Sequence, residues 1–234
     1  MHDVLTHDDS MRDRLMVALD VPNADAALAI RDEIGTEAGW LKVGLRLFVA
    51  EGPALIRDLA NRHKIFLDLK FHDIPNTVAQ AVESAGGLGV QMLNVHAGGG
   101  PEMLKAASRA ADGFPDMKLI AVTVLTSDSL PAVEAHKLAL ERARMTQDAG
   151  LDGVVCSVHE ASAIKDICGP GFITVTPGIR WGDQDVQDQK RIADPAMAVK
   201  SGSDYLVVGR PILMADQPGI AAREAVKMMA STLL

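Results

Sequence analysis

Three charged side chains stand close together in the stretch KIFLDLKFHDIPNTV, residues 64–78. Asp68 and Lys70 are two residues apart, and Asp73 follows three residues after Lys70. The apolar and β-branched residues around Asp68 and Lys70 predict a buried strand, in which alternate side chains share one face. Opposite charges interleaved in this way keep one another ionised. The stretch can therefore place the Lys70 ammonium group, which stays charged between two carboxylates, next to negative charge that develops in a reaction.

Lys42, in an earlier apolar run, makes a set of four charges with Asp68, Lys70 and Asp73 that sums to zero. An unpaired charge in a protein interior is very unfavourable, so these groups are expected to pair with one another. A structural ion-pair network is the alternative to a functional site. Because buried ion pairs add little stability compared with apolar replacements, we favour the functional interpretation.

Eight short apolar runs recur along the chain, and each is followed by a segment that can be helical. The runs span residues 15–19, 40–43, 65–69, 91–95, 118–124, 153–156, 172–176 and 205–208. The helical segments span residues 24–34, 53–61, 78–86, 101–111, 131–149, 160–167, 195–200 and 220–230. This alternation is typical of βαβ units and predicts an α/β fold, a closed (β/α)8 TIM barrel rather than an open sheet. We expect one domain over residues 1–234, with residues 1–13 as a polar leader.

Barrels of this kind build their active sites at the C-terminal ends of the strands and in the loops that follow. Polar or small residues at the predicted ends are Asp20, Lys42, Gly44, Asp68, Lys70, Asn94, His96, Thr126, Pro177, Arg180, Gly209 and Arg210. Alternation points Asp68 and Lys70 into the barrel, and Leu67 and Leu69 toward the helices. Two lysines and two or three aspartates are thus expected to converge at one mouth.

Three of these positions also have plainer explanations. Asp20 could simply terminate the first strand. Thr77 with Gln80 fits a capping box that opens the next helix. The run HAGGG, which begins at His96, is interpreted as a strand-to-helix turn, although its glycines could let backbone amides approach a phosphate.

The loops after the seventh and eighth strands are the usual phosphate site of barrels that bind phosphorylated ligands. They read TPGIRWGDQDVQDQKR and VVGRPI. Arg210, beside Gly209, suits bidentate capture of a phosphate. The first loop is long and polar, as expected of a lid, and it carries Arg180 and Gln189. Taken alone, those two residues would be assigned to a solvated loop.

The composition excludes several classes of protein. Hydrophobic residues make up 48% and charged residues 23% of the chain, as in globular rather than disordered proteins. The formal charge of −8 argues against binding to nucleic acid or an anionic membrane, which needs a basic surface. The two cysteines, Cys156 and Cys168, indicate neither a disulfide framework nor a zinc site. The polar start and the lack of a long apolar run predict a cytoplasmic protein.

These stretches together resemble the orotidine 5′-phosphate decarboxylase family, whose members make UMP in pyrimidine biosynthesis. The resemblance covers nearly the whole chain, through LMVALD, LKVG, FLDLKFHDIPNT, VTVLTS, TPGIR, DQKR and VVGRPI. The DxKxxDIPNT element is highly specific for the family, whereas the looser DxKxxD also occurs in its relatives.

The resemblance implies a homodimer that converts orotidine 5′-monophosphate to UMP and CO2 without a metal or an organic cofactor. It implies that Lys70 protonates C6 of the pyrimidine and that Asp68 lies beside the substrate carboxylate. Lys42 and Asp73 would complete the charge array, with Asp73 and Thr77 reaching across from the partner subunit. The implied contacts to the ribose are Asp20 and Lys42, and the implied contact to the pyrimidine is Thr126. The implied contacts to the phosphate are Arg180, Gln189, Gly209 and Arg210. Ile74 and Pro177 are expected to be further substrate-binding residues.

Three other functions are compatible with parts of the pattern. One is a related phosphosugar enzyme, a 3-keto-gulonate-6-phosphate decarboxylase or hexulose-6-phosphate synthase, whose aspartates hold magnesium; here two nearby lysines compete for the same carboxylates. Another is a Schiff-base aldolase that uses Lys42 or Lys70, which requires a neutral amine that the flanking aspartates disfavour. The third is a catalytically silent nucleotide-binding barrel, against which the intact charge array argues.

Overall fold

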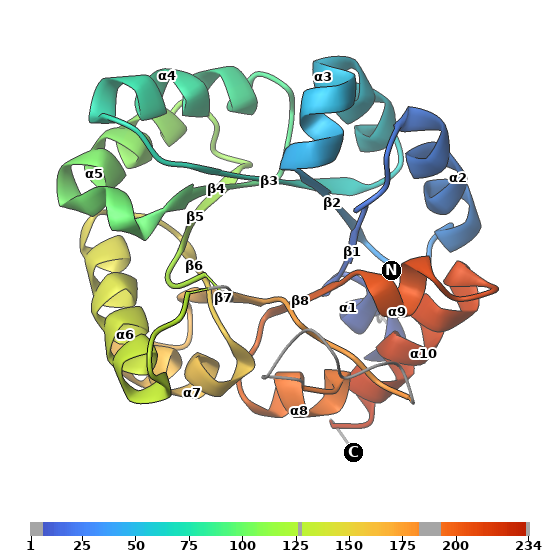
Figure 1. The fold of residues 1–234 in the computed structure, drawn as a ribbon. Helices are drawn as coiled ribbons and strands as arrows, with labels where there is room; N and C mark the ends of the chain where they lie inside the picture. Colours follow the sequence, from blue (N-terminus) through green and yellow to red (C-terminus); the bar gives the residue numbers. More distant parts are fainter. Residues whose placement is uncertain (1–6, 126–127, 183–192, 233–234) are drawn as a thin grey trace, which may run out of the picture.

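In the computed structural model, eight parallel strands close into a barrel that the helices surround (Figure 1). Each strand pairs with the next along the chain, and the last pairs with the first. The structure describes residues 7–125, 128–182 and 193–232. The strands are β1 (Leu15–Ala18), β2 (Trp40–Gly44), β3 (Lys64–Phe71), β4 (Met92–His96), β5 (Lys118–Val122), β6 (Gly153–Val155), β7 (Ile173–Thr176) and β8 (Tyr205–Val208). The predicted (β/α)8 barrel is confirmed.

The helices lie outside the strands and cover the whole circumference of the barrel (Figure 1). They are α1 (His7–Arg12), α2 (Ala24–Ile34), α3 (Leu45–Ala60), α4 (Pro75–Gly86), α5 (Gly100–Ala111), α6 (Ala132–Asp148), α7 (Val158–Cys168), α8 (Pro195–Lys200), α9 (Arg210–Leu213) and α10 (Pro218–Ala230), with a 3-10 turn, η1 (Ala97–Gly99). Among the described residues, no helix has the length and apolar character needed to cross a bilayer.

Three short elements are additional to the predicted ones. Helix α1 lies in the segment expected to be a polar leader, and its Met11 is buried in the main hydrophobic core. The turn η1 joins β4 to α5, so the interpretation of HAGGG as a strand-to-helix turn is correct. Helix α9 follows β8 directly and places Arg210 at its first position.

The alternation of side chains along the strands builds two cores. Phe66 lies in the cluster that fills the barrel interior, together with Met16, Trp40 and Met92. Leu67 and Leu69 belong to the larger cluster between strands and helices, on the opposite face of β3. Burial of each such side chain stabilises the fold by roughly 1.5–3 kcal/mol. The facing predicted for β3 is therefore correct, and it directs Asp68 and Lys70 inward above Phe66.

The start of α4 differs from the prediction. The helix begins at Pro75, with Ile74 as its N-cap, and no side chain caps it. Proline suits the first turn of a helix because its φ is preset and it has no N–H to leave unpaired. Thr77 thus lies inside the first turn, and the predicted capping box of Thr77 and Gln80 is wrong. A capping box does occur in α7, between Ser157 and Glu160.

Helix α3 begins at Leu45, well before the predicted start at residue 53. Gly52 and Pro53 stand at that predicted start. Gly52 has φ 66° and ψ −161°, so the backbone turns there and two helical segments join at a kink. The glycine therefore interrupts the helix and does not precede it, because a residue without Cβ can adopt this conformation without strain.

Candidate active site

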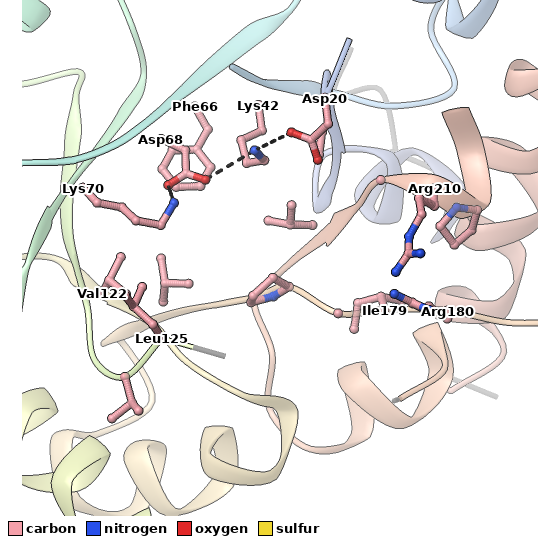
Figure 2. Close-up of a pocket in the computed structure, with 18 residues that line it drawn as sticks. Asp20, Lys42, Phe66, Asp68, Lys70, Val122, Leu125, Ile179, Arg180 and Arg210 are labelled. Atoms are coloured by element: carbon pink, nitrogen blue, oxygen red, sulfur yellow. Dashed lines mark hydrogen bonds and ion pairs between the residues drawn. The ribbon is translucent and has the colours of Figure 1, made fainter. Parts of the chain in front are cut away.

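A cavity of about 290 Å³ opens at the C-terminal ends of the strands. Figure 2 shows its charged side chains in a row from Lys70 to Asp20, with Arg180 and Arg210 together at another side. The remaining walls are largely apolar. Its lining comprises Ala18, Asp20, Lys42, Phe66, Asp68, Lys70, Val122, Val124, Leu125, Val155, Pro177, Gly178, Ile179, Arg180, Val207, Gly209, Arg210 and Pro211.

Four of these residues form a chain of alternating charges. The Lys42 ammonium lies 3.4 Å from an Asp20 oxygen and 3.3 Å from Oδ2 of Asp68. The other Asp68 oxygen, Oδ1, accepts a hydrogen bond of 2.6 Å from Lys70 Nζ. The order Asp20, Lys42, Asp68, Lys70 sums to zero, so the charges compensate one another within one chain. Asp20 takes part in this array, which favours a site role over simple strand termination.

Asp68 is the centre of the array, and its surroundings shift its pKa. Burial, the largest single effect, disfavours its charged form, and its side chain is only 13% exposed. The charges of Lys42 and Lys70, with hydrogen bonds from Lys70 and Asn94, together outweigh burial and hold the pKa of Asp68 below its usual value. Asp68 is therefore a carboxylate throughout the neutral pH range.

The backbone at Lys70 is unusual for a strand. Lys70 has φ 51°, in the left-handed region, and the pairing of β3 with β4 shifts register between Leu67 and Phe71. Asn94 of β4 lies opposite and is fully buried. The sequence marks Asn94 as a polar residue at a strand end, but its partners depend on the register of two strands. The sequence signal for a role of Asn94 is that a polar residue stands inside a buried apolar run, where it must find hydrogen-bond partners.

Arg180 and Arg210 lie next to each other at the cavity edge, after β7 and β8 (Figure 2). Among the described residues, no acid lies within ion-pairing distance of the Arg210 guanidinium, which is exposed. The Arg180 side chain is buried. Its backbone N–H donates to Ala193 O at 3.0 Å, and Ile179 pairs with Ala193, so the two ends of the intervening loop are joined. The two arginines give this edge of the cavity a local positive charge.

Not all predicted site residues reach the cavity of this chain. Asp73, Ile74 and Thr77 are exposed and do not line it. The Asp73 carboxylate instead accepts a hydrogen bond from the backbone N–H of Ile74. Thr126, Gln189 and most of the loop expected to act as a lid lie outside the described residues.

The part of the chain that the structure describes contains no group of three or more His, Cys, Asp or Glu side chains placed to hold a metal ion. At the cavity, the two oxygens of Asp68 each face an ammonium group, as given above. Cations of the protein itself thus occupy the positions from which a divalent ion would approach this carboxylate.

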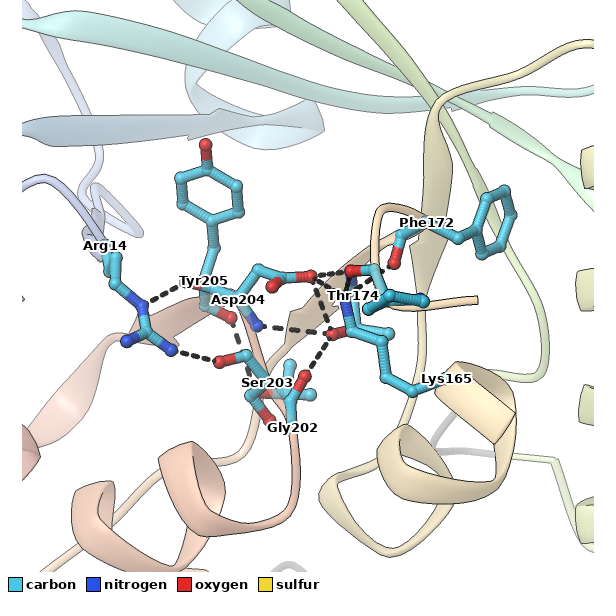
Figure 3. A network of polar contacts seen from close by, with 10 residues as sticks. Arg14, Lys165, Phe172, Thr174, Gly202, Ser203, Asp204 and Tyr205 are labelled. Carbon is cyan, nitrogen blue, oxygen red and sulfur yellow. Dashed lines mark hydrogen bonds and ion pairs between the residues drawn. The ribbon is translucent and has the colours of Figure 1, made fainter. Parts of the chain in front are cut away.

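A second polar network lies at the opposite, N-terminal end of the barrel (Figure 3). Asp204 Oδ2 accepts hydrogen bonds from Lys165 Nζ at 2.6 Å and from the Thr174 backbone N–H at 2.8 Å. Arg14 donates to the carbonyls of Ser203 and Asp204. These bonds tie α7, β7, β8 and the start of β1 together, and the residues that make them do not line the cavity described above. We assign this network to stability, as is usual for that face of a barrel.

The chain is similar to known proteins of one family. The sequence profile of the orotidine 5′-phosphate decarboxylase / HUMPS family matches residues 13–225. A protein of Nostoc sp. named orotidine 5′-phosphate decarboxylase is 46% identical over 225 residues, which are 89% of this chain and 94% of that protein. One from Carboxydothermus hydrogenoformans with the same name is 46% identical over 236 residues, 95% of this chain and 98% of that protein.

Solved structures give a similar result. The crystal structure of orotidine 5′-phosphate decarboxylase from Lactobacillus acidophilus superposes with a TM-score of 0.80 at 35% identity, covering 93% of this chain and 99% of that one. An uncharacterized conserved protein from Geobacillus kaustophilus superposes with a TM-score of 0.77 at 35% identity, covering 92% and 99% of the two chains.

Proposed function

The chain belongs to the orotidine 5′-phosphate decarboxylase / HUMPS family, and from this premise we propose that it decarboxylates orotidine 5′-monophosphate to UMP and CO2 in pyrimidine biosynthesis. The observation that carries the proposal is the array of Asp20, Lys42, Asp68 and Lys70 at the mouth of the barrel. It places a cation and a fixed carboxylate side by side in a cavity with an arginine pair at its edge.

Loss of CO2 from C6 of the orotate ring breaks the bond between C6 and the carboxylate carbon and leaves the electron pair on C6. That pair lies in the plane of the ring and cannot delocalise into the π system, so a nearby cation must stabilise it. Lys70 is assigned this role. Its ammonium group first opposes the negative charge and then transfers a proton to C6, which gives UMP and a neutral amine that regains a proton from water.

Asp68 contributes to the same step in two ways. Its lowered pKa keeps it charged, and it holds the ammonium group of Lys70, the proton donor, through the 2.6 Å hydrogen bond to Oδ1. We also assign it a position beside the substrate carboxylate, where repulsion between the two carboxylates is relieved as CO2 leaves. Binding elsewhere on the substrate must offset that repulsion in the bound state.

The phosphate group is the obvious source of that binding. Arg210 and Arg180 lie at the cavity edge, and Gly209 leaves room for the ligand to approach the backbone. Arginine holds phosphate through two parallel hydrogen bonds. Asp20 and Lys42, between the two regions, are assigned to the ribose hydroxyls and Pro177 to the nucleoside. The contacts of Thr126 with the pyrimidine and of Gln189 with the phosphate stay predictions that rest on the resemblance.

We further propose that the enzyme is a homodimer in which Asp73 and Thr77 complete the neighbouring site. Both residues are exposed and outside the cavity of their own chain, and Ile74 between them is 65% exposed, which is unusual for a large apolar side chain. Mixing the inactive variants K70A and D73A tests this arrangement. Mixed dimers would hold one intact site and recover activity; a mixture that stays inactive would contradict it.

An absorbance assay with orotidine 5′-monophosphate tests the function itself. Decarboxylation that persists in EDTA, with no trapping of substrate by borohydride, would support the proposal against the magnesium-dependent phosphosugar enzymes and a Schiff-base aldolase. UMP binding without turnover would indicate a silent nucleotide-binding barrel instead. The pathway and the two buried, unpaired cysteines fit a cytoplasmic location, which we infer on that basis.

A further inference from the structure

We propose that Asn94 is a positioning residue, which holds the Asp68 carboxylate and the Lys70 backbone in the arrangement that protonates C6. The inference rests on the proposed function, because it assumes that Lys70 is the proton donor. Asn94 itself does not line the cavity. It acts through two residues that do.

The Asn94 side chain connects the two residues with its two amide atoms. Its Oδ1 accepts a hydrogen bond of 2.7 Å from the backbone N–H of Lys70. Its Nδ2 donates a hydrogen bond of 2.7 Å to Oδ1 of Asp68. That same Asp68 oxygen accepts the bond from Lys70 Nζ. Because Nδ2 can only donate and Oδ1 can only accept, these partners also fix which way the amide is turned.

The backbone at Lys70 needs such a partner. From one paired position to the next, β3 advances from Leu67 to Phe71, four residues, while β4 advances from Leu93 to Val95, two residues. The ladder of hydrogen bonds is therefore interrupted at Asp68, Leu69 and Lys70. Bulges of this kind re-aim side chains beside active sites. The backbone N–H of Lys70, which has no partner in the ladder, donates its hydrogen bond to the Asn94 side chain instead.

The conformation at Lys70 supports the same conclusion. Among the described residues, Lys70 is the only one besides glycine with φ in the left-handed region. L-amino acids with a long side chain disfavour this region, and such a residue persists only where its surroundings impose it. Asn94 is fully buried and belongs to a strand that is paired on both sides, so it is a rigid anchor.

Loss of this anchor should affect the chemical step more than substrate binding. Without the two bonds, the backbone of Lys70 can relax, which moves Nζ relative to Asp68 and to C6. A misplacement of about 1 Å can lower a rate about 100-fold. The arginines at the cavity edge do not contact Asn94, so their share of binding should persist.

Two variants separate the hydrogen bonds from mere packing. Asn94→Ala removes both bonds. Asn94→Asp keeps the acceptor for the Lys70 N–H and supplies a donor to Asp68 only when the new carboxyl is protonated. We expect kcat of N94A to fall about 100-fold or more with KM nearly unchanged. We expect N94D to be more active than N94A, either at all pH values or only at low pH, where the new carboxyl is protonated.

Thr174→Val is the matched control, since it removes a buried hydrogen bond, to Gly202 O, at the other end of the barrel. It should lower the Tm and leave kcat intact. A wild-type kcat in N94A, a loss confined to KM, or N94D as inactive as N94A at every pH would overturn the proposal. If N94A fails to fold, N94V replaces it, since valine suits a strand and offers neither a donor nor an acceptor; a wild-type kcat there would overturn the proposal equally. Lys70→Ala is assayed alongside: turnover in that variant would refute the proton donor itself, whereas its inactivity beside fully active Asn94 variants would refute only the positioning role.

Discussion

Replacing Arg210 with alanine tests whether substrate binding is separate from the chemistry at the charge array. Arg210 starts helix α9 and is exposed at the cavity edge, with no acid among the described residues within ion-pairing distance. The side chain therefore has little to do with the stability of the fold. An exposed substitution of this kind changes the free energy of unfolding by about 0.5 kcal/mol at most.

The effect on the substrate should be much larger. A hydrogen bond to a charged group contributes about 1.5–3 kcal/mol. Arg210 can make two to a phosphate, and since the site is partly exposed to water the lower value applies to each. The sum is about 3 kcal/mol, and about 1.4 kcal/mol corresponds to a factor of ten. We therefore expect kcat/KM to fall about 100-fold in R210A, with a similar loss in affinity for UMP.

Steady-state decarboxylation, UMP titration and thermal unfolding measure the three quantities. Arg109→Ala is the control, because Arg109 is also exposed but lies in the last turn of α5, at the other end of the barrel. Orotidine, which lacks the phosphate, is the second substrate. If Arg210 acts on the phosphate, R210A and wild type should use orotidine equally. An equal loss with both substrates, or an unchanged affinity for UMP, would refute the assignment.

Further predictions concern charge and packing at three residues, Asp68, His63 and Phe66. Asp68→Asn should lower kcat at least 100-fold, in the assay above; wild-type kcat would contradict its role. The lowered pKa of Asp68 stabilises the folded state above the unfolded pKa of about 3.9. This stabilisation is lost as pH falls through the folded pKa, so the difference in Tm between wild type and D68N should shift against the wild type below about pH 4; a constant difference would contradict it. Burial lowers the pKa of His63, whose Nε2 lies 2.8 Å from Gly35 O; a base with a lowered pKa makes stability fall as pH drops below about 6.5. His63→Gln should reduce that fall in unfolding experiments, and an unchanged slope would count against it. Phe66→Ala should cost about 3–5 kcal/mol in denaturant unfolding, because Phe66 fills the barrel interior; a loss below about 1 kcal/mol would show that the interior repacks.

The barrel is predictable because its pattern is local and repeated. Each strand is recognisable from its short apolar run. The alternation of side chains along β3 is enough to predict that Asp68 and Lys70 lie on the inner face, and no neighbouring strand has to be known. The errors occur where a residue has two local uses. Gly52 and Pro53 look like the start of a helix but form a kink within α3. Thr77 looks like a cap, but Pro75 starts the helix two residues earlier.

The site is less predictable because its details depend on contacts between strands. The spacing of Asp68 and Lys70 indicates that they share a face, but the left-handed backbone of Lys70 arises from the register of β3 against β4. The same register brings Asn94 between them. Asp20 joins the array only because β1 and β2 are neighbours in the closed barrel. Asp73 and Thr77 lie away from the cavity of their own chain, so the role proposed for them requires a second subunit.

In the proposed mechanism the Lys70 ammonium meets and protonates the carbanion at C6. Proton transfer that occurs in one direction must also occur in reverse, so the enzyme should exchange the C6 hydrogen of UMP for deuterium in D2O. NMR of UMP with wild type should show loss of the C6–H signal, whereas K70A should bind UMP and leave that signal unchanged. Exchange by K70A at a rate near that of the wild type would contradict this mechanism.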